Sequence, residues 1–312
     1  MSICPSRPAI PFAFATIALS GSVDAERLRR GRERLALLGT HIDDEIDATA
    51  QWRYFAGDDG QRLTSLHRAL ASEADVVLFA RGGYGLSRLL DRIDWSGVAA
   101  SRKVFCGYSD VTAFSLASLA CAGYVTFAGP VAAGEFAQTE DEEARNYAER
   151  HFVALLSSDR YVYPTATSDV DHGSGVVQGT LWGTNLAMVS HLVGTPYMPQ
   201  IDDGILLLED IGEAPYRVER MFWQLKHAGI LDRQRAIILG AFTDCEPAAG
   251  MRYPYAMAEA IETLREIAPC PVLTGFPFGH IPAKVTLPIG APAEIAVNGS
   301  QYTLSVRDYF SR

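Results

Sequence analysis

The stretch VFCGYSDVTAF, residues 104–114, decides the fold of the N-terminal half. An apolar run ends at Gly-Tyr-Ser-Asp, and a second apolar run starts directly after it. This pattern predicts a buried strand, a tight turn and a helix, with Ser109 in the turn. Two roles are open at this point. Ser109 or Asp110 caps the helix, or Ser109 is a nucleophile held on a strained strand-to-helix turn.

The same alternation extends upstream. Residues 62–85, RLTSLHRALASEADVVLFARGGYG, have a helical period that leads into an apolar strand and a glycine-rich turn. Strands that alternate with helices predict a mainly parallel sheet with helices on both faces. The functional loops of such a sheet lie at the carboxyl ends of its strands. We therefore expect a doubly wound α/β domain over residues 1–160.

The second half has a different pattern. The polar stretch PTATSDVDHGSG, residues 164–175, predicts a linker, which we place at 161–175. The chain beyond it contains further strands and helices, and residues 285–306 alternate and turn as short β-strands do. The sequence thus predicts a second, mixed α/β domain over residues 176–312.

Composition excludes several classes of function. The hydrophobic fraction of 48% and the charged fraction of 21% are typical of a globular protein. The net charge of −10, without a long Lys/Arg run to offset it, argues against a nucleic-acid partner. The apolar runs are too short to predict a membrane span. A small molecule or a peptide is the favoured substrate.

The cysteines and the first apolar run bear on the compartment. The five cysteines are scattered without a CxxC pair or a zinc-ligand spacing, which predicts reduced thiols and no metal site. Residues 7–26 fit either a weak secretory signal or a first buried strand. We favour the strand because the run leads directly into an amphipathic helix. The expected location is the cytoplasm.

Three side chains suited to catalysis lie at predicted strand ends: Ser109, Glu209 and His280. Glu209 ends GILLLE, where a carboxylate needs a partner because an unpaired buried charge is costly. Taken singly, Glu209 fits a salt bridge and His280 fits an inert loop histidine. Taken together, the three supply the nucleophile, base and orienting acid of a catalytic triad.

Five blocks of the sequence resemble the LD-carboxypeptidases, or murein tetrapeptide carboxypeptidases. The blocks are VVLFARGGYGLSRLLDRIDW, GYSDVTAF, GTLWGTNLAMVSHLVGTPYMP, GILLLEDIGEAPYRVERMFWQLKHAGIL and GFPFGHIPAKVTLPIGA. The resemblance implies a serine peptidase with a Ser–Glu–His triad at Ser109, Glu209 and His280, in a cleft between two domains. Glu213 competes for the acid role, but Glu209 ends the apolar strand and matches the family block.

The resemblance also implies a substrate. It is a muropeptide tetrapeptide whose terminal D-alanine is released from an L-configured centre, usually diaminopimelate, during peptidoglycan recycling. The oxyanion would be bound by the backbone of Asp110 and of Gly82 or Gly83, because glycine admits close approach of the main chain. The stretch RGGYG also fits a plain flexible turn, but its spacing does not match a phosphate-binding loop.

The candidate substrate contacts include cations and aromatic rings. A cation is expected at the free terminal carboxylate, and Arg81 and Arg217 are the candidates. The aromatic residues that we expect in the cleft are Tyr84, Trp182 and Tyr216, although aromatic rings of this kind are more often core.

Two other functions stay open. One is a microcin-immunity type of peptidase that cleaves a peptidyl or aminoacyl nucleotide, which the compact spacing between GYSD and LLLED disfavours. The other is a non-catalytic muropeptide-binding protein, which the presence of Ser109, Glu209 and His280 disfavours. We expect no cofactor, no nucleic-acid or membrane partner, and a homodimer.

Overall fold

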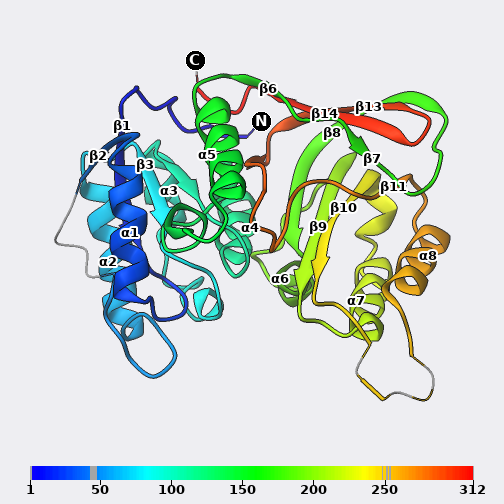
Figure 1. Ribbon diagram of the computed structural model, residues 1–312, viewed down its shortest axis with the longest axis horizontal. Coiled ribbons are helices and arrows are strands. Elements are labelled where there is room, and N and C mark those ends of the chain that lie inside the picture. The colour runs from blue at the N-terminus through cyan, green and yellow to red at the C-terminus, as the bar shows by residue number, and fades with distance from the viewer. Residues whose placement is uncertain (1, 43–47, 248, 251, 253, 312) are drawn as a thin grey trace.

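The molecule is built around two sheets that lie side by side (Figure 1). The structure is a computed structural model that describes residues 2–42, 48–247, 249–250, 252 and 254–311. Helices α1, α2 and α3 lie around the first sheet, whereas α7 and α8 flank the second sheet on its far side (Figure 1). The prediction of a two-domain α/β fold is confirmed.

The first sheet is mainly parallel, as predicted. Its order is β12-β5-β4-β3-β1-β2, and β2, β1, β3, β4 and β5 pair in parallel. The order reverses between β1 and β3, which is where ligands bind in sheets of this type, outside the carboxyl ends of the strands. The strands are β1 (Phe12–Ile17), β2 (Gly39–His41), β3 (Val76–Phe79), β4 (Val104–Cys106), β5 (Thr126–Ala128) and β12 (Leu287–Ile289).

Each parallel connection in this sheet runs through a helix. The predicted strand, turn and helix at residues 104–114 are confirmed as β4, a turn and α4, and α4 ends at a left-handed Gly123. The helices of this half are α1 (Ala25–Leu35), α2 (Asp59–Ala71), η1 (Leu86–Arg88), α3 (Trp95–Ala100), α4 (Val111–Ala122), η2 (Glu135–Ala137) and α5 (Glu142–Leu156).

The second sheet is mixed, as predicted. Its order is β11-β10-β9-β8-β13-β14-β6, with β7 also paired to β14. Strands β8 to β11 are parallel, whereas β13 and β14 form an antiparallel hairpin against β8. The strands are β6 (Arg160–Val162), β7 (Ala166–Thr167), β8 (Ser174–Asn185), β9 (Gly204–Ile211), β10 (Gln234–Thr243), β11 (Val272–Leu273), β13 (Pro292–Asn298) and β14 (Gln301–Arg307). The helices are α6 (Leu186–Leu192), α7 (Pro215–His227), η3 (Leu231–Arg233) and α8 (Met257–Ile267).

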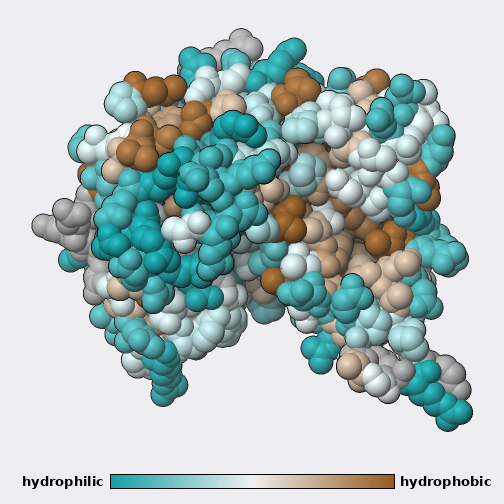
Figure 2. All heavy atoms as spheres, in the orientation of Figure 1, coloured by the Kyte–Doolittle hydropathy of each residue, from teal (hydrophilic) through white to brown (hydrophobic). Residues whose placement is uncertain are grey.

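The chain crosses between the two halves more than once. Residues 161–175, expected to be a linker, contain β7 and part of β6, which both pair with β14. Near the other end of the chain, β12 returns to the first sheet and pairs antiparallel with β5. The two sheets are therefore joined by paired strands as well as by the connecting chain. Figure 2 shows the surface notched between the two halves along the lower edge.

Helix α1 packs closely against the loop that precedes η2. A Cβ at Gly31 would lie 1.9 Å from the carbonyl oxygen of Ala132, so glycine is needed for this approach. Charged side chains cover the exposed side of α1, where the surface is hydrophilic (Figure 2). In the described part of the chain, no helix has both the length and the apolar character required to span a bilayer.

Candidate active site

Ser109 lies in a strained turn between β4 and α4. Its φ angle is 66°, in the left-handed region that a side chain with a Cβ rarely adopts. Such a conformation costs on the order of 1–3 kcal/mol and is found at functional sites. Asp110 occupies the N-cap position of α4, but neither its side chain nor that of Ser109 caps the helix in the described structure. The capping role considered for these residues is therefore wrong.

The glycine-rich loop after β3 lies directly against this turn. A Cβ at Gly82 would lie 2.7 Å from the Cβ of Ser109, so a larger residue would displace the serine. Among the described residues, the backbone N–H groups of Gly82, Gly83 and Asp110 donate no hydrogen bond. Gly82 and Gly83 also line the cavity that Ser109 lines.

The Asp110 carboxylate holds the surrounding loops together. It accepts hydrogen bonds from Ser20 Oγ at 2.6 Å and from the Leu86 backbone N–H at 3.0 Å. Burial raises the pKa of Asp110 above its ordinary value, and these two bonds oppose the rise. The carboxylate links the loop after β1 and the start of η1 to the turn that carries Ser109.

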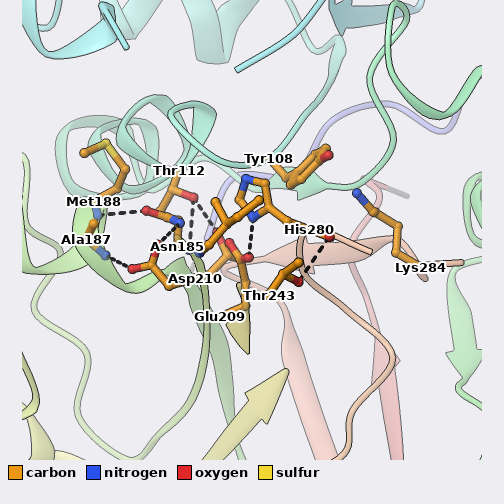
Figure 3. A network of polar contacts seen from close by, with 12 residues as sticks. Tyr108, Thr112, Asn185, Ala187, Met188, Glu209, Asp210, Thr243, His280 and Lys284 are labelled. Atoms are coloured by element: carbon orange, nitrogen blue, oxygen red, sulfur yellow. Dashed lines mark hydrogen bonds and ion pairs between the residues drawn. The ribbon is translucent and has the colours of Figure 1, made fainter. Parts of the chain in front are cut away.

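Glu209 and His280 form a hydrogen-bonded pair at the end of the second sheet, with Glu209 buried and His280 partly exposed. His280 Nδ1 donates to Glu209 Oε2 at 2.8 Å, and the Thr243 hydroxyl donates to the His280 carbonyl at 3.1 Å (Figure 3). The Glu209 side chain is fully buried. Glu209 was expected to end its strand, and this is wrong by two residues because β9 continues to Ile211.

Ser109 and His280 line the same cavity, whose volume is about 500 Å³. Within the described residues Ser109 Oγ has no hydrogen-bond partner, and no bond joins it to His280. Such bonds are often long in ligand-free sites and shorten when substrate binds. The lining residues are Val23, Asp24, Arg27, Arg81, Gly82, Gly83, Tyr108, Ser109, Val131, Ala133, Gly134, Ile211 and His280.

The predicted substrate contacts separate into two groups. Arg81 lines the cavity and donates to the backbone oxygens of Ser22 and Gly82, both at 3.2 Å. Trp182 does not line it, because its ring is buried in the core and its indole N–H donates to Gln234 at 2.8 Å. The prediction of Trp182 in the cleft is wrong.

Three further expected contacts lie outside the cavity lining. Tyr84 is half exposed and packs against Phe55, with ring centroids 5.8 Å apart. Tyr216 is also half exposed at the start of α7. Arg217 is exposed next to Glu213, with 3.7 Å between the charged groups. The structure places these three residues in exposed positions instead of in the cavity.

Sequence reasoning missed two groups of residues around the cavity. Arg27 of α1 lines it, and its guanidinium makes no hydrogen bond or ion pair within the described residues. Tyr108, Glu135 and Lys284 form a buried polar cluster beside His280. The position of Tyr108 directly before Ser109 could have indicated that it lies at the site. Glu135 and Lys284 could not be found in this way, because charged residues are normally expected at the surface.

The described residues contain no group of three or more His, Cys, Asp and Glu side chains arranged to hold a metal ion. The groups that the structure brings together are a hydroxyl, an imidazole and a carboxylate, with two arginines in the cavity lining. Nucleophilic acyl transfer uses groups of these kinds.

Comparison with known proteins identifies the family. The model of the LD-carboxypeptidase N-terminal domain matches residues 14–129, and that of the LD-carboxypeptidase C-terminal domain matches residues 178–295. The chain belongs to the LD-carboxypeptidase family. It is accordingly a hydrolase of the carboxypeptidase type.

Several named proteins are similar to this chain. The crystal structure of muramoyltetrapeptide carboxypeptidase from Oxalobacter formigenes has a TM-score of 0.87 and 35% identity, over 96% of this chain and 100% of that chain. The murein tetrapeptide carboxypeptidase of Pseudomonas aeruginosa is 34% identical over 218 residues, 67% of each protein. The microcin C7 self-immunity protein of Escherichia coli is 28% identical over 261 residues, 75% of this chain and 74% of that protein.

In this LD-carboxypeptidase family member, Asp210 supports the segment next to Glu209. Its carboxylate accepts hydrogen bonds from Asn185 Nδ2 at 3.1 Å, from Ala187 N–H at 2.9 Å and from Ile211 N–H at 2.8 Å (Figure 3). Burial raises the pKa of Asp210 to about 6, the Ile211 bond opposes the rise, and the charge of Glu209 adds to it.

This pKa predicts a dependence of stability on pH. The folded state holds the Asp210 proton more tightly than the unfolded state, so the stabilisation present at pH 4 is lost as the pH rises through about 6. Relative to Asp210→Asn, the wild type should lose about 2 kcal/mol of unfolding free energy between pH 4 and pH 7. Urea unfolding at both pH values measures this, with the exposed Asp202→Asn as the control. Parallel pH curves for wild type and Asp210→Asn would contradict the prediction.

Proposed function

We propose that this protein is a serine LD-carboxypeptidase that releases the terminal D-alanine of muropeptide tetrapeptides, at the bond after diaminopimelate, in peptidoglycan recycling. The observation that carries the proposal is the presence of Ser109 and the Glu209–His280 pair around one cavity. Two similar proteins are named murein tetrapeptide carboxypeptidase and muramoyltetrapeptide carboxypeptidase, and these names support a muropeptide tetrapeptide as the substrate.

The proposed mechanism begins with the proton on His280. Because Nδ1–H donates to Glu209, the neutral imidazole has Nε2 free to accept the Ser109 proton. Ser109 Oγ then bonds to the acyl carbon, and His280 protonates the leaving nitrogen of D-alanine as the C–N bond breaks. Water, deprotonated by the same imidazole, cleaves the resulting ester and restores Ser109.

The tetrahedral intermediate carries a negative oxygen that needs donors. We assign this role to the N–H of Asp110 together with that of Gly82 or Gly83, since these groups donate no hydrogen bond within the described residues. Donors already in place before reaction stabilise the developing charge at little cost of reorganisation. The absence of a Cβ at Gly82 admits the backbone to within reach of Ser109.

The free carboxylate of the terminal residue needs a cation. We assign it to Arg27 and Arg81, because both line the cavity and the Arg27 guanidinium is unpaired among the described residues. Arg217, the other candidate from the sequence, lies by Glu213 outside the lining. A charge-assisted hydrogen bond to a carboxylate contributes about 1.5–3 kcal/mol.

The proposal also places the enzyme in the cytoplasm. The five cysteines all lie in the described part of the chain and are free thiols. Muropeptides taken up for recycling would meet the enzyme in that reducing compartment. A homodimer stays a prediction, which light scattering during size-exclusion chromatography can test.

The decisive experiment uses stereochemistry. The acyl carbonyl must reach Ser109 while the terminal carboxylate reaches its arginine, and inverting one centre prevents both contacts at once. Mass spectrometry should show loss of D-alanine from an L,D-linked tetrapeptide and no cleavage of a matched D,D-linked peptide. Equal cleavage of both would reject the specificity, and cleavage of a peptidyl nucleotide instead would favour the microcin-immunity type of activity.

A second prediction concerns the triad. Ser109→Ala and Glu209→Gln should each lower kcat by at least about a thousandfold, because they remove the nucleophile and the partner of the imidazole. Glu213→Gln is the matched control and should retain kcat within about threefold. Steady-state release of D-alanine by each folded variant measures this. A greater loss in Glu213→Gln than in Glu209→Gln would mean that the other carboxylate is the acid.

A third prediction concerns the terminal carboxylate. Arg27→Ala should lower kcat/KM for the free-acid tetrapeptide about 10–100-fold, and should affect the terminal amide much less. Arg217→Ala provides the control, with similar small effects on both substrates. Kinetics with the paired acid and amide substrates distinguish the two arginines. The assignment fails if Arg27→Ala weakens acid and amide cleavage equally.

A further inference from the structure

A buried cluster of Tyr108, Glu135 and Lys284 lies next to the proposed triad. Lys284 Nζ donates to Glu135 Oε1 at 2.6 Å, and the Tyr108 hydroxyl donates to the same oxygen at 3.0 Å. Lys284 Nζ also lies 3.4 Å from the centroid of the Tyr108 ring, which is cation–π distance. Tyr108 therefore contacts both charged groups, Glu135 through its hydroxyl and Lys284 through the face of its ring.

Each member of the cluster comes from a different segment of the chain, and Tyr108 itself lines the cavity. Tyr108 directly precedes Ser109 in the turn after β4. Lys284 lies in the loop that leads from His280 to β12. Glu135 lies in η2, and its second oxygen accepts the Val131 N–H at 3.0 Å, in the cavity-lining loop before that helix. The cluster thus connects the segments that carry the proposed nucleophile and the proposed base.

The imidazole of His280 is in contact with this cluster. The rings of Tyr108 and His280 meet edge to face, with centroids 5.0 Å apart and an angle of 60° between their planes (Figure 3). Glu209 holds Nδ1, and Thr243 holds the backbone carbonyl of the same residue. Tyr108 adds a third contact, on the ring, and so restricts its rotation toward or away from Ser109.

The buried Lys284–Glu135 ion pair is expected to contribute little to the free energy of unfolding, because removing two charges from water is costly. Lys284 is fully buried, and burial lowers its pKa although the charge of Glu135 opposes the effect. Burial acts to raise the pKa of Glu135, but the Lys284 charge and the hydrogen bonds outweigh it and hold that pKa below its ordinary value. Replacing such a pair by apolar residues is often neutral or stabilising. A function other than stability therefore accounts better for two charges at this position.

We propose that the Lys284–Glu135 ion pair, acting through Tyr108, is a clamp that positions the His280 loop of the second half against the Ser109 turn of the first. Lys284, Glu135 and Tyr108 are positioning residues, because they act on the proposed catalytic groups and not on the substrate. The clamp rests on the proposed function, in which His280 takes the proton from Ser109. Misplacement of a catalytic group by about 1 Å can cost on the order of a hundredfold in rate.

The test separates positioning from stability by removing both charges together. Lys284→Met and Glu135→Gln each disrupt the ion pair and should lower the melting temperature. The double variant Lys284→Met/Glu135→Leu removes both charges, so its melting temperature should return to near that of the wild type. Its kcat for D-alanine release should nevertheless stay about tenfold to a hundredfold below wild type, with KM changed by less than about threefold.

A matched control is available in the ion pair between Arg34 of α1 and Glu149 of α5. These groups are 2.6 Å apart and lie outside the cavity lining. The double variant Arg34→Met/Glu149→Leu removes an ion pair between two elements of the first half, and its kcat should equal that of the wild type. A comparable loss of kcat in this control would overturn the clamp, because the loss would then follow from removal of any ion pair.

A second readout does not depend on the peptide substrate. A fluorophosphonate probe phosphonylates an activated serine: the serine oxygen bonds to phosphorus, fluoride leaves and the serine proton passes to the base. Its rate of reaction with Ser109 therefore reports the Ser109–His280 alignment directly. The rate should fall in the Lys284→Met/Glu135→Leu variant by a factor similar to that for kcat. Tyr108→Phe retains the ring and should lose less than about fivefold, whereas Tyr108→Ala should lose as much as the double variant.

The outcomes are distinct for the clamp and for the proposed function. If the wild type reacts with the probe but does not release D-alanine, the substrate is wrong and the probe rates still decide the clamp. If the wild type does not react at Ser109, the nucleophile and the clamp are both rejected. If the double variant reacts and turns over at the wild-type rate, the ion pair is structural and the clamp alone is rejected.

Discussion

The buried carboxylate of Glu209 is the constraint on which the site depends. Its side chain is fully buried in β9, and Oε1 has no hydrogen-bond partner among the described residues. The Nδ1–H of His280 supplies the hydrogen bond that offsets the cost of burying this polar group away from water. His280 is therefore held at one place and in one tautomer, with Nε2 directed away from Glu209. Nucleophile, loops and cavity are arranged around this fixed imidazole.

Ser109, the proposed nucleophile, follows a strand of the other sheet, so the candidate site forms only where the two halves meet. Several contacts fix that junction: β12 pairs with β5, and Thr112 of α4 accepts a hydrogen bond from the Asn185 N–H at 3.3 Å. Thr112 lies three residues after Ser109, and Asn185 pairs with Glu209 in the register of β8 and β9. A short chain of contacts thus links the turn of Ser109 to the strand of Glu209.

Strain and packing support each other at the Ser109 turn. The left-handed backbone of Ser109 is unfavourable by itself, and the surrounding structure has to hold it. The Asp110 carboxylate provides part of this support by bonding Ser20 and Leu86, and the Tyr108 side chain provides another part through Glu135. Both neighbours of the serine are thus anchored, and the serine itself is left free to face the cavity.

The sequence determined the strand, turn and helix around Ser109 and the three residues proposed for catalysis, but not the short strands β6 and β7 in the stretch expected to be a linker. The periodicity of apolar residues depends only on neighbouring positions in the chain. Ser109 and His280 closely follow apolar segments, so this periodicity was enough to identify them. Tertiary structure decided which side chains reach the cavity. Trp182 lies in the last part of β8, residues 181–185, where every residue is buried, and alternation there cannot distinguish core from cleft. Glu135 and Lys284 are 149 residues apart, and a charged residue is normally expected at the surface. Their burial depends on a partner that only the folded chain supplies.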